Sequence, residues 1–268
     1  MSPTPYISWI GHGAANFSPP EVFSGANFYV FAFDANSAAI QTLADTLLNP
    51  AGGGQVRYEA ALPTAIVSFC DAAKCSSAAE PIGWLPGRET MILVPLWEFQ
   101  SGNLLPSRLV FWAPYIFINY TIGLVSGREI WGWPKVLGEI GVPADGPGNE
   151  FFCKTTIFPT LAASTPAENA VLYRVTQASG VTPAAIPFRD AAEAGRGIAE
   201  GLLGSLGADV VQALSIQPRV DCVALKQFRE PSAPDLACYQ AIVDSPIVLT
   251  AFSGGGLLSG SFTVEITT

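Results

Sequence analysis

A single lysine in an apolar setting is the clearest candidate for a reactive residue in this sequence. Lys135 is one of only four lysines, and its near neighbours in the chain are Trp131, Trp133, Pro134, Val136 and Leu137. An ammonium among such groups loses hydration, which favours the neutral amine. A neutral amine attacks a ketone to give an imine, which then withdraws electrons from the adjacent carbon. From composition alone the alternative is a lysine whose stem crosses a tryptophan ring while its amine stays in water.

The residues around this lysine also follow a family signature. Gly127-Arg128-Glu129, Trp133-Pro134-Lys135 and Leu137-Gly138 stand in the order and spacing of that signature. In these residues the chain resembles the acetoacetate decarboxylase superfamily, whose members activate a lysine to form an imine. The resemblance implies that Lys135 is the imine-forming residue.

The resemblance extends beyond the lysine segment, over roughly residues 25 to 265. Glu89 lies six residues before Pro95, at the interval that separates the family's catalytic glutamate from a proline ending an apolar strand. Leu225–Arg229 and Ala237–Gln240 resemble a pattern of the less characterised branches. The resemblance implies that Glu89 transfers protons or orients the substrate. Its alternative is a glutamate paired with the adjacent Arg88.

The sequence departs from the decarboxylases at three places. Val136 stands where they have a second lysine, and Cys70 appears where they have a second active-site glutamate. Asn27 and Phe28 lie near the place of their early arginine. Imine chemistry is therefore a safer expectation than decarboxylation. Some superfamily members use the same lysine for aldol or dehydration reactions on pyruvate-like substrates.

Other polar side chains are weaker candidates for the site. Arg128 and Glu129 match the motif and are predicted with Trp133 to bind substrate, or else they pair with each other or brace the corner. Tyr239 is predicted as a hydroxyl acid and Gln240 as an amide donor to the substrate. The alternative is that the tyrosine lies on a helix and packs into the core.

Composition excludes several classes of function. The net charge of −9 argues against nucleic acid and anionic membranes as partners. The lone histidine, His12, and the absence of a Gly-x-Ser-x-Gly elbow disfavour hydrolase triads, and the cysteine spacings suit no zinc site. No cofactor is expected, since the imine forms on the protein itself. The five cysteines are odd in number and scattered, which predicts free buried thiols.

Location and assembly follow from the same composition. No leading signal segment and no apolar run long enough to span a bilayer is evident, so a cytoplasmic location is expected. Only 13% of residues are charged, which suggests that other subunits cover part of the surface. We expect a homo-oligomer acting on a small-molecule keto acid.

The elements that must position these residues are mostly strands. Apolar and β-branched runs predict strands at 28–33, 56–61, 65–70, 90–97, 109–118, 139–142, 151–158, 170–176, 220–228, 247–252 and 261–266. Helices are predicted at 37–48, at 121–130 before a Gly-Trp-Pro corner that delivers Lys135, and within 189–214. Residues 1–27 show no period and are predicted to form an arm or lid.

These elements predict an α+β fold. No linker divides the chain, so residues 1–268 are expected to form a single domain on a closed or conical antiparallel sheet with a few inserted helices. The resemblance implies the same architecture. The expected function is an imine-forming lyase, with decarboxylation of a β-keto acid first, aldol–dehydration chemistry second, and a binding protein without catalysis third.

Overall fold

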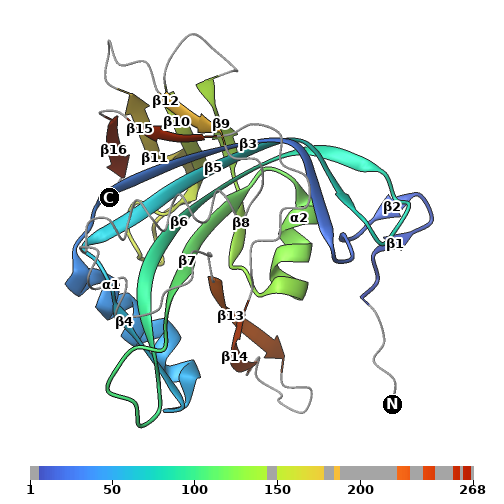
Figure 1. Cartoon of the computed structure of the whole chain (residues 1–268). Helices are drawn as coiled ribbons and strands as arrows, with labels where there is room; N and C mark the ends of the chain where they lie inside the picture. Colours follow the sequence, from blue (N-terminus) through green and yellow to red (C-terminus); the bar gives the residue numbers. More distant parts are fainter. Residues whose placement is uncertain are drawn as a thin grey trace, which may run out of the picture.

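The computed structural model describes residues 6–143, 150–177, 184–187, 222–229, 238–244, 256–259 and 262–266. Within these ranges the chain forms a main sheet of ten strands, a second sheet of four, and a hairpin of two (Figure 1). The main sheet has the order β12-β15-β3-β5-β6-β7-β13-β14, with β4 paired to β6 and β8 paired to β7. The second sheet has the order β16-β11-β10-β9.

The strands of the main sheet are β3 (Glu21–Asp34), β4 (Val56–Ala60), β5 (Thr64–Ser77), β6 (Trp84–Gln100), β7 (Arg108–Ile118), β8 (Lys135–Leu137), β12 (Ala184–Pro187), β13 (Cys222–Arg229), β14 (Cys238–Asp244) and β15 (Gly256–Ser259). Those of the second sheet are β9 (Glu139–Gly141), β10 (Glu150–Ile157), β11 (Glu168–Gln177) and β16 (Phe262–Ile266), and the hairpin joins β1 (Trp9–Ile10) to β2 (Gly13–Ala14). The helices are α1 (Ser37–Leu43) and α2 (Thr121–Ser126), followed by the π-helical turns η1 (Ala44–Leu48) and η3 (Gly127–Trp131), with a 3-10 turn η2 (Asn49–Gly52).

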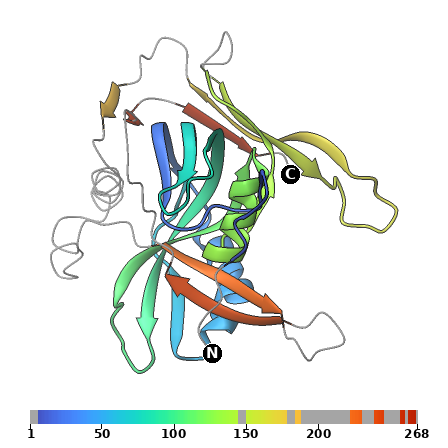
Figure 2. The same cartoon turned by 90° about the vertical axis from the view of Figure 1, so that its right-hand side faces the viewer.

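The long strands β3, β5, β6 and β7 are apolar on both faces, because successive side chains alternate and both faces are covered. On face A, Val30, Ile66, Leu93 and Ile116 join one buried cluster. On face B, Phe31, Val67, Phe69 and Phe117 join another, which includes residues of the second sheet. The second sheet therefore packs on face B, and Figure 2 shows β10 and β11 extending to one side of the main sheet.

Several expectations from the sequence need correction. The described strands form two separate sheets, so a closed barrel is not observed among them, and the main sheet is mixed because β7–β8, β7–β13 and β3–β15 pair in parallel. The predicted arm is shorter, since residues 21–27 lie within β3 and pair with β5. The predicted α+β class is confirmed. Among the described residues, no helix has the length and apolar character of a membrane span. The helix predicted within 189–214 and the strand at 247–252 lie outside the described residues.

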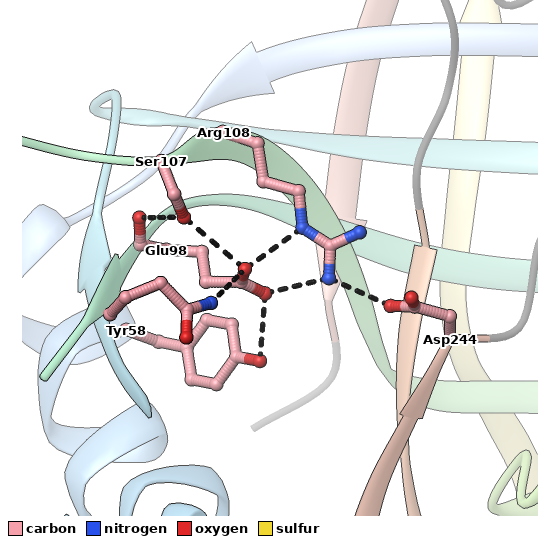
Figure 3. A network of polar contacts seen from close by, with 6 residues as sticks. Tyr58, Glu98, Ser107, Arg108 and Asp244 are labelled. Carbon is pink, nitrogen blue, oxygen red and sulfur yellow. Dashed lines mark hydrogen bonds and ion pairs between the residues drawn. The ribbon is translucent and has the colours of Figure 1, made fainter. Parts of the chain in front are cut away.

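An ion-pair network around the buried Glu98 of β6 attaches the hairpin of β13 and β14 to the start of β7 (Figure 3). Glu98 is only 3% exposed, and its carboxylate accepts hydrogen bonds from Arg108 Nε at 2.9 Å and Arg108 Nη2 at 2.8 Å. The same guanidinium donates to Asp244 of β14 at 2.7 Å. Tyr58, Ser107 and Gln100 also donate hydrogen bonds to the Glu98 carboxylate. Two strands distant in the sequence are thereby linked by charge.

Removing the cation of this network is expected to cost about 3–5 kcal/mol of unfolding free energy, because Arg108→Ala leaves the Glu98 carboxylate buried without its counter-charge. Chemical denaturation of the variant measures the loss. Arg57→Ala is the matched control: its ion pair with Glu59 is exposed, so about 1 kcal/mol or less is expected. Equal losses in the two variants would contradict a stabilising role for the network.

Candidate active site

The helix α2 and the turn η3 deliver Lys135 to the edge of the main sheet, as predicted from the Gly-Trp-Pro corner. The turn ends at Gly132, whose φ of +81° is a left-handed conformation that favours glycine. Trp133 N–H then donates to Gly127 O at 2.9 Å, and Lys135 N–H donates to Trp133 O at 2.8 Å. Lys135 is the first residue of β8 and lies beside Ile116 of β7 in parallel register.

Two residues of the signature hold the lysine itself. Gly127 is buried, and a Cβ placed on it would lie 2.6 Å from Lys135 Cε, so the stem of the lysine occupies the space that a side chain would need. Arg128 Nη1 donates to the main-chain oxygen of Lys135 at 3.0 Å. The signature glycine is therefore explained by close approach to the lysine, and the signature arginine braces the corner.

Substituting the glycine tests this contact. Gly127→Ala is expected to lower turnover at least about 100-fold, because the methyl group forces the lysine stem, and with it the amine, out of position by about an ångström. Steady-state kinetics measures the effect. Gly52→Ala is the matched control, since its Cβ would meet no atom closer than 3.8 Å. Wild-type turnover in Gly127→Ala would show that the amine does not need this packing.

The amine of Lys135 contacts the carboxylate of Glu89. The lysine is 7% exposed, and Nζ hydrogen bonds to Glu89 Oε2. Glu89 lies on face A, two residues before Met91 of the face A cluster. Its neighbour Arg88 therefore points to the opposite face, where it pairs with Asp71 at 2.9 Å. The alternative in which Arg88 neutralises Glu89 is wrong, because adjacent residues of a strand face opposite ways.

A second carboxyl group, that of Glu21, lies in the same electrostatic environment. Glu21 is the first residue of β3, and its Oε1 accepts a hydrogen bond from Trp131 Nε1 at 3.1 Å. Burial raises the pKa of Glu21. The charge of Lys135 and the hydrogen bond from Trp131 lower this pKa, and the charge of Glu89 raises it again. The net pKa is raised, so the protonated acid persists to a higher pH than usual.

Buried neutral groups complete this region. Burial raises the pKa of the Cys75 thiol to about 11, although a hydrogen bond from Tyr120 acts in the opposite direction. Burial also raises the pKa of the Tyr120 phenol well above its ordinary value. Both groups interact electrostatically with Glu89 and Glu21. Cys70, opposite Glu89 on β5, also has a pKa raised by burial. At neutral pH the thiols and the phenol are uncharged, so the acidic groups that can ionise in this region are Glu89 and Glu21.

The other predicted site residues lie in η3, just after it, and in β14. Glu129 is exposed, and its main-chain oxygen accepts a hydrogen bond from Tyr6 at 2.9 Å. Trp133 is partly buried and packs on the face A cluster. Gln240 is exposed on β14 opposite Gln227. Tyr239 lies in the same strand opposite Phe228, so the helix considered for it is wrong, and its side chain is outside the described residues.

Sequence reasoning missed Glu21, Cys75 and Tyr120. Glu21 lay in the segment interpreted as an arm, and no spacing relates it to Lys135. The contact with Trp131 arises only when β3 and η3 meet in the folded chain. A glutamate at the start of an apolar strand is only a weak indication of a functional residue, because glutamates at such positions are usually exposed on the surface.

The four cysteines whose side chains are described, Cys70, Cys75, Cys153 and Cys222, are buried and form no disulfide with one another, as expected. Among the described residues no group of three or more His, Cys, Asp or Glu could hold a metal ion. The site brings the amine of Lys135 together with the carboxyl groups of Glu89 and Glu21.

Solved structures show what the fold resembles. An acetoacetate decarboxylase from Legionella pneumophila is 16% identical, with a TM-score of 0.54 over 99% of this chain and 78% of that chain. Another acetoacetate decarboxylase is 11% identical, with a TM-score of 0.55 over 95% of this chain and 78% of that chain. An acetoacetate decarboxylase-like enzyme from Sphingomonas wittichii is 13% identical, with a TM-score of 0.55 over 98% of this chain and 86% of that chain.

At such low identity these comparisons show the fold. No protein-family model matches the chain, and no curated protein matches it in sequence. The chain therefore has an acetoacetate decarboxylase-like fold, which confirms at the level of structure the resemblance found in its lysine motif.

Proposed function

We propose that this protein is a lyase that forms an imine between Lys135 and a small keto acid, and that it decarboxylates a β-keto acid. One observation carries the proposal: of the four lysines, Lys135 alone is buried, and its amine contacts the carboxylate of Glu89. The other three, Lys74, Lys154 and Lys226, are exposed or half-buried. The similarity of the fold to acetoacetate decarboxylases supports the same reading.

The contact between Lys135 and Glu89 provides the first step. The Lys135 amine contacts the Glu89 carboxylate, so a proton can pass from the ammonium to this carboxylate and leave the neutral amine as nucleophile. The neutral amine attacks the ketone carbon, and the proton released from nitrogen passes to the new alkoxide through Glu89. Loss of water then gives a cationic imine on Lys135.

The cationic imine drives the second step. In a β-keto acid, the bond between the carboxylate and the α-carbon breaks, and its electron pair moves toward the imine nitrogen to give an enamine and carbon dioxide. Protonation of the enamine carbon and hydrolysis of the imine release the ketone and restore the amine. The apolar wall of face A, against which Trp133 packs, favours this step because a carboxylate is less stable there than neutral carbon dioxide.

A second candidate is an aldolase–dehydratase that uses the same lysine on pyruvate and an aldehyde. The observation that favours it is the second carboxyl group, Glu21, near the amine. Aldol addition followed by dehydration needs more proton transfers than decarboxylation, and two carboxyl groups supply them. Val136 also favours this candidate, because this exposed apolar residue follows Lys135 and supplies no second positive charge to the site.

Product analysis separates the two reactions. Acetoacetate incubated with the protein is expected to release carbon dioxide, whereas pyruvate plus an aldehyde would give a conjugated product with a new absorbance. Carbon dioxide release that depends on Lys135 supports the decarboxylase, and a new chromophore with no carbon dioxide supports the aldolase. If neither forms and no covalent adduct is found, the protein binds small molecules without catalysis. The homo-oligomer expected from the sparse charge remains a prediction.

A further inference from the structure

Glu21 is held by the same turn that holds the lysine. Trp131 Nε1 donates to Glu21 Oε1 at 3.1 Å, and Trp131 is the last residue of η3, whose first residue, Gly127, packs on the lysine stem. The indole therefore fixes the carboxyl group of β3 relative to Lys135, although the two residues are far apart in the chain.

The charges around Glu21 are those of the amine site. The charge of Lys135 lowers the pKa of Glu21, and the charge of Glu89 raises it. Two carboxyl groups beside one amine repel each other when both are ionised, so the site retains a proton on one of them. Glu89 is the group in contact with the amine, whereas burial raises the pKa of Glu21 and so favours its acid form.

We propose that Glu21 is a second catalytic acid of this site, which donates the proton that lets the carbinolamine hydroxyl leave as water. The proposal rests on imine formation at Lys135. In this step the O–H bond of Glu21 breaks, its proton joins the hydroxyl group, and the bond from carbon to that oxygen breaks. The nitrogen lone pair forms the second bond to carbon, which leaves a cationic imine, a water molecule and the Glu21 carboxylate.

The charge balance of this step suits the site. In its acid form Glu21 carries no charge and does not repel a substrate carboxylate. After the step its carboxylate lies near the positive imine, which it stabilises. The neutral groups nearby are weaker acids: the pKa of Cys75 is about 11, and that of Tyr120 is raised above its ordinary value. Glu89 contacts the amine and serves the proton transfers of its nitrogen, and Glu21 as a second acid serves the hydroxyl group.

The test measures the rate of imine formation, with pyruvate as the probe. Pyruvate carries its carboxylate on the carbonyl carbon, so it stops at the imine and enamine stage without releasing carbon dioxide. Protein and pyruvate are mixed, quenched with borohydride at increasing times, and the adduct on Lys135 is quantified. Glu21→Gln preserves shape and the oxygen that accepts from Trp131, but it cannot donate an acid proton. We expect its rate to fall about 100-fold.

The pH dependence separates a catalytic acid from a structural residue. The wild-type rate is expected to decline as pH rises through the raised pKa of Glu21, because the acid form is lost there. This basic limb is expected to be absent in Glu21→Gln. Trp131→Phe removes the donor to Glu21 while keeping an aromatic ring, and a smaller fall is expected. Glu168→Gln, at an exposed glutamate, is expected to match the wild type.

The outcomes are distinct from those of the proposed function. A slow adduct in Glu21→Gln that reaches the wild-type amount at long times, together with loss of the basic limb, supports Glu21 as the acid. A rate within about threefold of the wild type, or an unchanged basic limb, overturns it while leaving the imine mechanism intact. If the wild type itself forms no adduct on Lys135, imine formation fails and the role of Glu21 fails with it.

Discussion

Replacing Lys135 with alanine is expected to abolish turnover, with a loss of at least about 10⁴-fold. The imine cannot form without the amine, and enzymes that act through a covalent intermediate lose nearly all their rate when the nucleophile is removed. Initial rates of carbon dioxide release from acetoacetate measure the loss. Lys135→Met gives the same expectation while filling the buried space left by the stem.

Two controls accompany this substitution. Lys154→Ala removes a lysine whose partner, Glu139, is exposed, and its turnover should equal that of the wild type. Val136→Lys should leave turnover measurable, because Val136 is 44% exposed and follows Lys135 on a strand, so the new ammonium points away from the amine. Wild-type rates in Lys135→Ala would end the imine proposal.

Substitution of Glu89 should give the second-largest loss of activity. Glu89→Gln keeps the size of the side chain but removes its negative charge and its capacity to carry a proton, so turnover should fall about 10²- to 10⁴-fold. The substitution leaves the amine in place beside an uncharged amide, so it can still attack a carbonyl. We therefore expect Glu89→Gln to lose turnover while still forming an adduct with pyruvate under borohydride.

Turnover and adduct formation measured together show whether Glu89 transfers protons or only positions Lys135. A loss of both turnover and adduct would mean that Glu89 holds Lys135 in place, which circular dichroism and thermal unfolding would also register. Turnover equal to the wild type would remove Glu89 from the mechanism. Glu59→Gln serves as control, since Glu59 pairs with Arg57 on the exposed strand β4.

The centre of the fold was predictable because its strands are apolar over their central residues. The predicted runs at 65–70, 90–97 and 109–118 lie within β5, β6 and β7. Their ends were missed where polar residues enter, as at Lys74 and Arg88, since hydrophobic pattern does not distinguish a polar strand end from a loop. The three-residue strand β8 was missed as well, because it forms only by parallel pairing with β7.

The site was predictable where local sequence determines it. The corner formed by Gly127, Gly132 and Pro134 brings Lys135 into the sheet, and its apolar neighbours indicated burial. Glu21 was not predictable, because its place beside Trp131 depends on β3 reaching η3 in the folded chain. The strand position of Tyr239 was missed for a similar reason, since β14 is an edge strand that Asp244 links to Arg108.

Borohydride trapping followed by peptide mass mapping is the most direct test of the account. The protein is incubated with pyruvate, and separately with acetoacetate, reduced, digested with trypsin and mapped across its four lysines. We expect one reduced adduct per chain, on Lys135, in a peptide that trypsin no longer cleaves after that residue. An absence of adduct, or an adduct distributed over Lys74, Lys154 and Lys226, would contradict the claim that this amine captures a carbonyl.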